Sequence, residues 1–370
     1  MPRGVFSRVW AVGLAWAAAA CLPDGQLKIP YNDEPHERDD GWSTQSPEAV
    51  GIDPVALRAA YRRFFSEDEF VSARSLLVVR HGQLVAEGYC RAGADRELIA
   101  SLQSATKSVT SLLLGIARDA DLLADLDQPV CEVLASACEK YPNKRKVTLR
   151  HLLTMRSGID FPNEDFALDM EHGGHKDSAE RVLAQPLARK PGEHFHYQDS
   201  DVHLLGAAIA EATGRSLSEF AQAHLFAPLG ITDSLWLSHA DGRNYGAFGL
   251  YLRPRDFAKL GLLALDRGSF HGERIVSEAW IEQSTQLQAE SSGKPHEHGF
   301  DYGYYWWVSE QHGVFSADGH GGQLAWVQPE LDLLIVLTAD WDTAYNVGPA
   351  ITLWEFASLA TQIADAISGP

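Results

Sequence analysis

The sequence predicts an α+β fold in which an antiparallel sheet, flanked by helices, is interrupted by an all-α insertion. Strand patterns occur over residues 75–90 and return over 302–339, whereas the chain between them contains a series of apolar-periodic helices. A last helix pattern, over 352–367, follows the final strand. Strands first, helices inserted and strands last predict one sheet that is built from both ends of the chain.

The individual elements follow from local signals. Asp53-Pro54 predicts the N-cap and first residue of a helix, and Ser75–Cys90 predicts a hairpin that turns at His81-Gly82. The helical middle is indicated by the runs "TLRHLLTMRSG", "VHLLGAAIAEATG", "SLSEFAQAHLF" and "RDFAKLGLLALDRG". Alternating aromatics predict a further strand, with side chains that are more often core than pocket: Tyr302, Tyr304, Tyr305, Trp306 and Trp307.

The chain of 370 residues is long enough for two domains or for one domain with an insertion. We expect a removed leader, a polar tether and one folded domain with a sheet part and a helical part. In residue numbers these are 1–20, 21–48, and 49–365, the last divided into a sheet part of about 49–110 and 260–365 and a helical part of about 111–259.

The N-terminus resembles an export signal. Arg3 and Arg8 supply a positive region, and Val9–Ala20 form an apolar core that is too short to span a bilayer as a helix. Cleavage after Ala20 would leave Cys21 first, as in a bacterial lipoprotein, but the same small residues also suit an ordinary signal peptidase. The sequence therefore predicts an exported protein, either periplasmic or held to the membrane by a lipid on Cys21.

Composition excludes several classes of partner. The formal net charge is −19, from 31 basic and 50 acidic residues. The protein therefore lacks the basic surface that binding to nucleic acid requires. His194-x-His196 is not a complete metal-ligand set, and we expect neither a metal nor a cofactor. Cys131 and Cys138 could form a disulfide in an oxidising compartment or lie as buried thiols two helical turns apart, and we favour the thiols.

Two serine–lysine pairs share the spacing of a nucleophile and its base. Ser291 and Lys294 lie in a polar stretch broken by glycine and proline, which predicts a solvated loop. Ser104 and Lys107 stand where a helix should begin, on one face, beside free backbone N–H groups that favour a developing negative charge. A capping serine with a surface lysine explains the same local pattern, so the segment alone leaves both interpretations open.

The rest of the chain bears on this choice. The stretches "LARKPGEHFHYQDSDVHLLGAAIAEATG" and "DGHGGQLAWVQPELDLLIVLT" follow "SATK" in order, and together they resemble the β-lactamase/transpeptidase-like serine hydrolases. That family carries Ser-x-x-Lys, then Tyr-x-Asn or Tyr-x-Ser, then Lys/His-x-Gly. The resemblance covers about Gly51 to Ala360. Within the family, the sequence resembles the branch of esterases and nylon-oligomer hydrolases.

The resemblance assigns roles to single residues. It implies that Ser104 is the acylated nucleophile and that Lys107 accepts its proton or orients it. Tyr197 matches the signature tyrosine, a phenol that needs cationic neighbours to act as a base, with Lys107 the obvious one. Asp199 departs from the usual asparagine or serine, and its carboxylate could bind Lys107 and hold it charged.

The third signature matches His320 and Gly322, expected on a strand edge. The resemblance implies that the oxyanion is held by the amide of Ser104 and by a second N–H near Gln323. His172-Gly173-Gly174 repeats this signature in a polar segment that predicts a loop.

The implied function is that of an exported serine hydrolase acting on an ester, amide or peptide. The alternatives are a β-lactamase or D-Ala-D-Ala carboxypeptidase, and a non-catalytic cell-wall binding module of the same fold. Relatives that cleave penicillins generally carry lysine where His320 stands, and an imidazole is mostly neutral above pH 7, which favours neutral substrates. Arg243 or Arg253 could replace that cation, but both are expected to be surface arginines.

Overall fold

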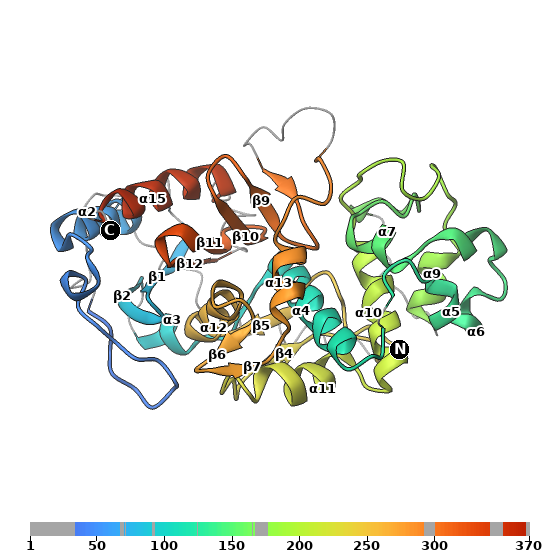
Figure 1. The fold of residues 1–370 in the computed structure, drawn as a ribbon, viewed down its shortest axis with the longest axis horizontal. Coiled ribbons are helices and arrows are strands. Elements are labelled where there is room, and N and C mark those ends of the chain that lie inside the picture. The colour runs from blue at the N-terminus through green and yellow to red at the C-terminus, as the bar shows by residue number, and fades with distance from the viewer. Residues whose placement is uncertain are drawn as a thin grey trace, which may run out of the picture.

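A seven-stranded antiparallel sheet forms the centre of the protein, in the order β2-β1-β12-β11-β10-β9-β8 (Figure 1). The computed structural model describes residues 34–66, 70, 72–90, 93–123, 125–164, 166, 177–291, 300–340 and 351–367. The strands of the sheet are β1 (Ala73–Arg80), β2 (Gln83–Tyr89), β8 (Asp301–Tyr302), β9 (Trp307–Ser309), β10 (Val314–Gly319), β11 (Gln323–Gln328) and β12 (Leu333–Ala339). The strands near the N-terminus and those near the C-terminus thus join in one sheet, because β1 pairs with β12 along its length.

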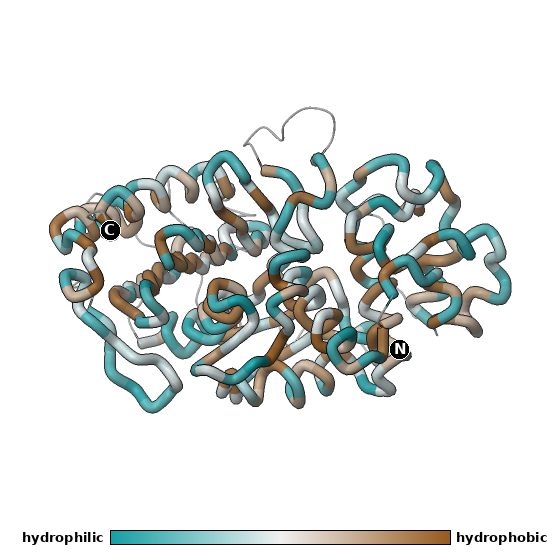
Figure 2. The backbone as a smooth tube through the Cα atoms, viewed as in Figure 1, coloured by the Kyte–Doolittle hydropathy of each residue, from teal (hydrophilic) through white to brown (hydrophobic). Residues whose placement is uncertain are grey.

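Each face of the sheet is covered by helices. The helices α2 (Pro54–Ser66) and α15 (Leu353–Asp365) pack on each other over one face, and α12 (Pro254–Leu265) packs against β11 and β12 on the other. Side chains alternate between the faces, so Leu76 belongs to the apolar cluster under α2 and Leu77 to the opposite cluster. Figure 2 shows the central strands as mostly hydrophobic.

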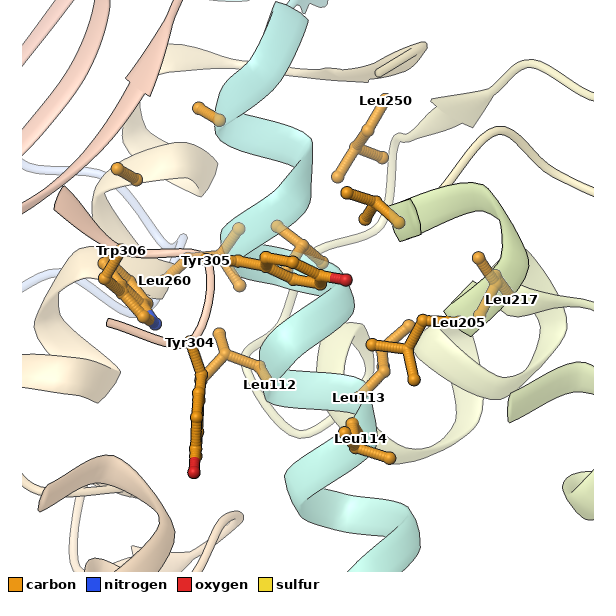
Figure 3. Packing of buried hydrophobic residues seen from close by; sticks show 14 of the residues in the cluster. Leu112, Leu113, Leu114, Leu205, Leu217, Leu250, Leu260, Tyr304, Tyr305 and Trp306 are labelled. Atoms are coloured by element: carbon orange, nitrogen blue, oxygen red, sulfur yellow. The ribbon is translucent and has the colours of Figure 1, made fainter. Parts of the chain in front are cut away.

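The helical part lies beside the sheet (Figure 1). Its elements are α5 (Val130–Val133), α6 (Ala135–Cys138), η4 (Pro142–Lys146), α7 (Leu149–Leu153), α9 (Ser178–Leu183), α10 (Asp199–Thr213), α11 (Leu217–Ala221) and the π-helical turn η5 (Gln222–Phe226). The long helix α4 (Thr106–Asp119) contacts α10 and α11, and so joins this part to the sheet. Figure 3 shows α4 between Tyr304 and Trp306 on one side and Leu205 and Leu217 on the other.

Shorter elements complete the described chain. They are η1 (Glu48–Val50), α3 (Gly93–Glu97), β3 (Ala100–Ser101), η3 (Gln103–Ala105), β4 (Leu235–Trp236), β5 (Leu250–Leu252), β6 (Ser269–Phe270), β7 (Glu273–Arg274), α13 (Glu278–Ser284) and η6 (Pro329–Leu331). The strands β3, β5 and β4 form a small second sheet. No helix among the described ranges has the length and apolar character needed to cross a bilayer.

Several predicted elements are confirmed. Asp53 caps α2, since its carboxylate accepts the N–H of Val55 at 2.8 Å. The hairpin turns at His81-Gly82, and the four apolar-periodic runs coincide for most of their helical residues with α7, α10, α11 and α12. The final helix is α15. These elements were readable because each depends on a local period or capping residue.

The predicted aromatic strand is wrong. Residues 303–306 bend between the short strands β8 and β9, and Tyr305 adopts a left-handed backbone (φ 65°). The bend lets Ser108 of α4 donate its hydroxyl to the carbonyl of Tyr305 at 2.6 Å. The aromatic side chains are nevertheless core, as expected, because Tyr302, Tyr304, Tyr305 and Trp306 are all buried; Trp307 is half-buried.

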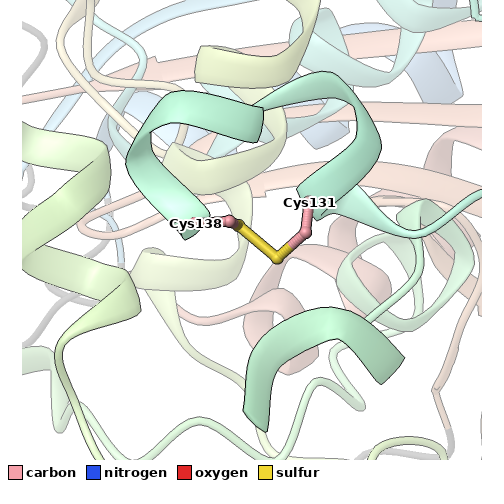
Figure 4. The surroundings of a disulfide bond; sticks show 2 residues. All are labelled: Cys131 and Cys138. Atoms are coloured by element: carbon pink, nitrogen blue, oxygen red, sulfur yellow. A yellow bond between two sulfur atoms is a disulfide. The ribbon is translucent and has the colours of Figure 1, made fainter. Parts of the chain in front are cut away.

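Cys131 and Cys138 form a disulfide, so the expectation of buried thiols is wrong (Figure 4). Their Cα atoms are 5.3 Å apart, whereas a continuous helix would separate them by roughly 10 Å. The reason is that the helix is interrupted at Leu134, the residue between α5 and α6. The break folds the second helix back, and the two sulfur atoms meet.

Residues 34–48, expected to belong to a polar tether, pack on the folded domain. Trp42 is buried, and its indole N–H donates to the carbonyl of Arg255 in α12 at 3.3 Å. Gln45 donates its backbone N–H to Leu84 of β2. The segment is largely hydrophilic (Figure 2), and composition therefore predicted a tether and not these contacts.

Candidate active site

Ser104 lies in a tight 3-10 turn, η3, between β3 and α4. The residue before it, Gln103, has a left-handed backbone (φ 48°), a conformation that costs a residue with a side chain about 1 kcal/mol. The hydroxyl of Ser101 accepts the N–H of Gln103 at 3.2 Å and so helps to hold this turn. Ser104 is partly exposed at the point where the chain enters α4. A strained turn that presents a hydroxyl is consistent with a functional residue.

Lys107 is buried in the first turn of α4, with a side chain 2% exposed. Its Nζ lies 2.8 Å from Ser104 Oγ, 3.1 Å from the carbonyl oxygen of Ala247 and 2.7 Å from Asp199 Oδ1. At the start of α4 no side chain makes a capping hydrogen bond. The alternative of a capping serine and a surface lysine is therefore wrong for this pair.

These contacts fix the charge of Lys107. Burial alone would lower its pKa, but the carboxylate of Asp199 and the phenol of Tyr197 outweigh burial, and the pKa is raised above the ordinary value. The oxygens of Ser104, Ala247 and Asp199 surround its Nζ, and the hydroxyl of Tyr197 is a further hydrogen-bond partner. These contacts therefore favour the ammonium form of Lys107, and the carboxylate of Asp199 is the group that raises its pKa most.

Tyr197 completes the group. Its hydroxyl is hydrogen-bonded with Ser104 and Lys107, and Lys107 Nζ lies 4.9 Å from the centre of its ring. Burial raises the pKa of this phenol, even though Lys107 acts in the opposite direction. Trp307 stacks on the ring at 5.7 Å, and Tyr302 meets it edge-on at 6.0 Å. The structure therefore brings together Ser104, Lys107, Tyr197 and Asp199, from two separate segments of the chain.

A buried polar cluster fixes the segment that carries Tyr197 and Asp199. Asp201 accepts the hydroxyl of Ser157 and the amide of Gln198, each at 2.5 Å. Burial raises the pKa of Asp201 to about 7. Asn163 accepts the backbone N–H of Asp199 at 2.8 Å. Sequence reasoning missed these residues, because the partners of Asp201 and Asp199 come from the loop after α7.

The third signature lies beside Ser104, but not as expected. His320 and Gly322 belong to the turn between β10 and β11, rather than to a strand edge, and His320 is exposed. Gly322 adopts φ 101°, which favours glycine. The turn forms because Gly319 and Gln323 are paired at the end of the hairpin.

The strand residue that meets the Ser104 turn is Gly319, which sequence reasoning did not single out. A side chain there would place its Cβ 2.1 Å from the carbonyl oxygen of Leu102 and 3.2 Å from the nitrogen of Ala105, so only glycine fits. The side chain of Gln323 is occupied elsewhere, since its amide bonds both backbone groups of Ala339 at the end of β12. An oxyanion contact from near Gln323 stays a prediction.

Asp318 is a second acidic residue near the site that the sequence did not single out. It stands in β10, is partly buried, and interacts electrostatically with Lys107 and Tyr302. Burial raises its pKa to about 7, and the charge of Lys107 opposes that shift. The carboxyl groups of Asp199 and Asp318 therefore both interact with Lys107.

The competing motifs have other settings. Ser291 is buried and donates its hydroxyl to the carbonyl of Phe300 at 2.8 Å, so the expectation of a solvated position is wrong, because β8 shields it. Arg253 pairs with Asp233 at 2.5 Å and with Glu97 at 3.6 Å. Arg243 is partly buried and stands near His203 and Asp241. Cys21, Lys294 and His172-Gly173-Gly174 lie outside the described residues.

His194 and His196 are both exposed. Within the part of the chain that the structure describes, no three histidine, cysteine, aspartate or glutamate side chains form a group that could hold a metal ion.

The family model of the beta-lactamase domain matches residues 62–352. The chain belongs to the beta-lactamase family. It is 27% identical over 329 residues to the 6-aminohexanoate-dimer hydrolase of Paenarthrobacter ureafaciens, which covers 81% of this chain and 80% of that protein. With the serine and lysine in contact, membership makes this chain a serine hydrolase of the beta-lactamase-related type.

Solved structures show the same fold at low identity. EstCE1, a hydrolase with promiscuous acyltransferase activity, has a TM-score of 0.68 at 18% identity, over 87% of this chain and all (100%) of that one. A penicillin-binding protein homologue from Caulobacter crescentus has a TM-score of 0.63 at 17% identity, over 78% and 92% of the two chains. The predicted fold class is thereby confirmed, and at these identities the likeness concerns the fold alone.

Proposed function

We propose that this beta-lactamase family member hydrolyses neutral esters or amides through an acyl-enzyme on Ser104. The observation that carries the proposal is the contact of Ser104 Oγ with Lys107 Nζ at 2.8 Å, beside the hydroxyl of Tyr197. The relation to a 6-aminohexanoate-dimer hydrolase supports amide cleavage, and the fold is shared with a hydrolase that has acyltransferase activity, EstCE1.

The proposed reaction has two halves. In the first, Ser104 Oγ bonds to the substrate carbonyl carbon, its proton passes to the Lys107–Tyr197 pair, and the pair then protonates the leaving alcohol or amine as the ester or amide bond breaks. In the second, the pair takes a proton from water, which attacks the acyl-enzyme, and Ser104 regains its proton. Since Lys107 and Tyr197 both hold protons in the free enzyme, one proton must leave the pair before it can act as a base.

The charges around the site support neutral substrates. The third signature and the residue before it read Gly319-His320-Gly321-Gly322, without a lysine. Asp199 and Asp318 both interact with Lys107, so the positive charge that could attract a substrate carboxylate is already balanced. The net charge of −19 adds a weak long-range repulsion of anions.

The test compares Ser104→Ala with Ser291→Ala. We expect Ser104→Ala to abolish turnover and labelling by a serine-reactive phosphonate, whereas Ser291→Ala retains labelling even if its stability falls. The substrate is tested by kcat/KM for a p-nitrophenyl ester and a chromogenic cephalosporin on one preparation. A cephalosporin value equal to or above the ester value would favour a β-lactamase, and a folded wild type that is never labelled would favour a non-catalytic binding module.

We further propose that the protein is exported and matures at Cys21. The Cys131–Cys138 disulfide supports an oxidising compartment. N-terminal mass spectrometry of periplasmic and membrane fractions tests both parts: release of a Cys21→Ala variant from the membrane would support the lipid, and an intact leader on cytoplasmic protein would refute export.

A further inference from the structure

Asp199 stands where the resemblance implies asparagine or serine, and it makes the shortest contact of Lys107. Its Oδ1 lies 2.7 Å from Lys107 Nζ, with only 15% of its side chain exposed. The residue opens α10, and its backbone N–H is fixed by the side chain of Asn163. The backbone of Asp199 is therefore fixed, and its carboxylate is largely shielded from solvent.

Two of the four oxygens around Lys107 can only accept a hydrogen bond. These are the carbonyl of Ala247 and the carboxylate of Asp199. The other two, the hydroxyl oxygens of Ser104 and Tyr197, can accept from an ammonium or donate to a neutral amine. The arrangement suits both protonation states of Lys107, and the change from one to the other reverses only a bond with one of these two hydroxyl groups. The negative charge of the Asp199 carboxylate favours the protonated state of Lys107 over the neutral one.

The groups that face Lys107 come from every element packed around it. They are Ser104 from η3, Tyr197 from the segment before α10, Asp199 from α10, Asp318 from β10 and the backbone oxygen of Ala247 before β5. Asp199 is the carboxylate in direct contact, and it precedes all other groups in raising the pKa of the amine. Asparagine at this position would keep an oxygen acceptor but remove the charge.

We infer that Asp199 is a positioning residue that holds Lys107 as an ammonium in the free enzyme and thereby sets the lower pH limit of catalysis. The inference rests on the proposed role of Ser104 as the nucleophile. Because an ammonium cannot accept the proton of Ser104, the active fraction of the enzyme rises as the pH rises. Replacing Asp199 by the neutral amide removes the charge that opposes loss of the proton.

The experiment is a pH profile of kcat/KM for wild type and Asp199→Asn with a neutral ester. We expect kcat/KM of the wild type to rise with pH without a plateau up to unfolding, and the rise in the variant to lie at lower pH by about one unit or more, the usual scale for loss of an adjacent opposite charge. The matched control is Asp256→Asn, which removes a buried carboxylate from Lys259, 3.2 Å away and outside the site. Its acid limb should coincide with that of wild type. Coincident limbs for wild type and Asp199→Asn would overturn the inference.

A second measurement is independent of turnover. Lysine labelled at the ε carbon is followed by NMR, with the Lys107 signal assigned by its loss in Lys107→Met. We expect Lys107 to remain an ammonium over the whole pH range in which the wild type stays folded, and to titrate within that range in Asp199→Asn. A neutral Lys107 in the wild type at pH 7 would refute the inference. Hydrolysis absent from every variant, with this titration intact, would instead defeat the proposed function.

Because Asp318 also titrates near pH 7, it needs its own control. Asp318→Asn combined with Asp199→Asn should show the same displacement of the Lys107 titration, relative to Asp318→Asn alone. Loss of the displacement in that background would assign the effect to Asp318 instead.

Discussion

At the scale of single residues, Lys107 and Tyr197 form one unit around the hydroxyl of Ser104. Each is hydrogen-bonded with Ser104 and with the other. Their titrations are coupled, because the ammonium lowers and burial raises the pKa of the phenol. Neither side chain can therefore be removed without changing the proton affinity of the other.

This coupling predicts how their variants combine. Lys107→Met and Tyr197→Phe should each reduce kcat by roughly 10²–10⁴-fold, the usual scale for general base catalysis. The double variant should be little slower than the slower single variant, because the two groups act together. Steady-state kinetics on all four proteins measures the combination. Losses that multiply strictly would show that the two residues have separate roles.

At the scale of elements, helix α4 decides whether the site forms, because it carries Lys107 and packs on both parts of the molecule. Gly115 lies where the helix meets Trp280 of α13, whose indole N–H donates to the carbonyl of Ser111 at 3.0 Å. Trp280 also stacks on Tyr304 at 5.6 Å, so its ring is fixed from two sides.

A methyl group at position 115 has no room. Its Cβ would lie 2.2 Å from Trp280 Cδ1, so Gly115→Ala should lower the free energy of unfolding by about 1–3 kcal/mol, although alanine is the better helix former. The matched control is Gly206→Ala in α10, where the nearest atom, 2.9 Å away, is a methyl group of Leu217 that can rotate. Urea denaturation compares the two. A stabilised Gly115→Ala would mean that the ring of Trp280 yields readily.

At the scale of the whole molecule, a buried ion pair ties the segment before η1 to the sheet and to α12. Arg255 and Glu87 are 5% and 0% exposed and lie 2.6 Å apart, and Arg255 also pairs with Asp40 at 2.7 Å. Burial would raise the pKa of Glu87, but the bonds from Arg255 and the N–H of His36 outweigh it, and the pKa is lowered. The pair therefore stabilises the fold at pH values above the ordinary pKa of glutamate, and this contribution is lost as the pH falls through the lowered value.

Arg255→Met should unfold more easily by about 3–5 kcal/mol near pH 7, because it leaves the carboxylate of Glu87 buried without a cation. The difference from wild type should begin to shrink at a pH above the ordinary pKa of glutamate, because burial without Arg255 raises the pKa of Glu87 in the variant and the carboxylate takes up a proton there. The control is Arg267→Met, which breaks the exposed pair with Glu278 and should change stability by less than about 1 kcal/mol. Thermal unfolding from pH 4 to pH 8 measures both. A constant difference across that range would contradict the assignment to Glu87.

The sequence by itself determined the local elements and singled out the pair Ser104 and Lys107. The hairpin at His81-Gly82, the capped start of α2 and the helix that carries Lys107 all depend on side-chain periods or caps within a few residues. The order of the three signatures then predicted the family and fold, because that order is a property of the chain and needs no coordinates.

Only the tertiary structure decided the chemistry of those residues. The charge of Lys107 depends on Asp199 and on the exclusion of water, the disulfide on a backbone break at Leu134, and the burial of Ser291 on the strand β8. The same holds for Gly319, where glycine is required because the carbonyl of Leu102, far away in the chain, lies so close. Local patterns indicate which side chains a segment contains. Solvation and charge come from groups far away in the chain, and no period or motif records which of them will meet.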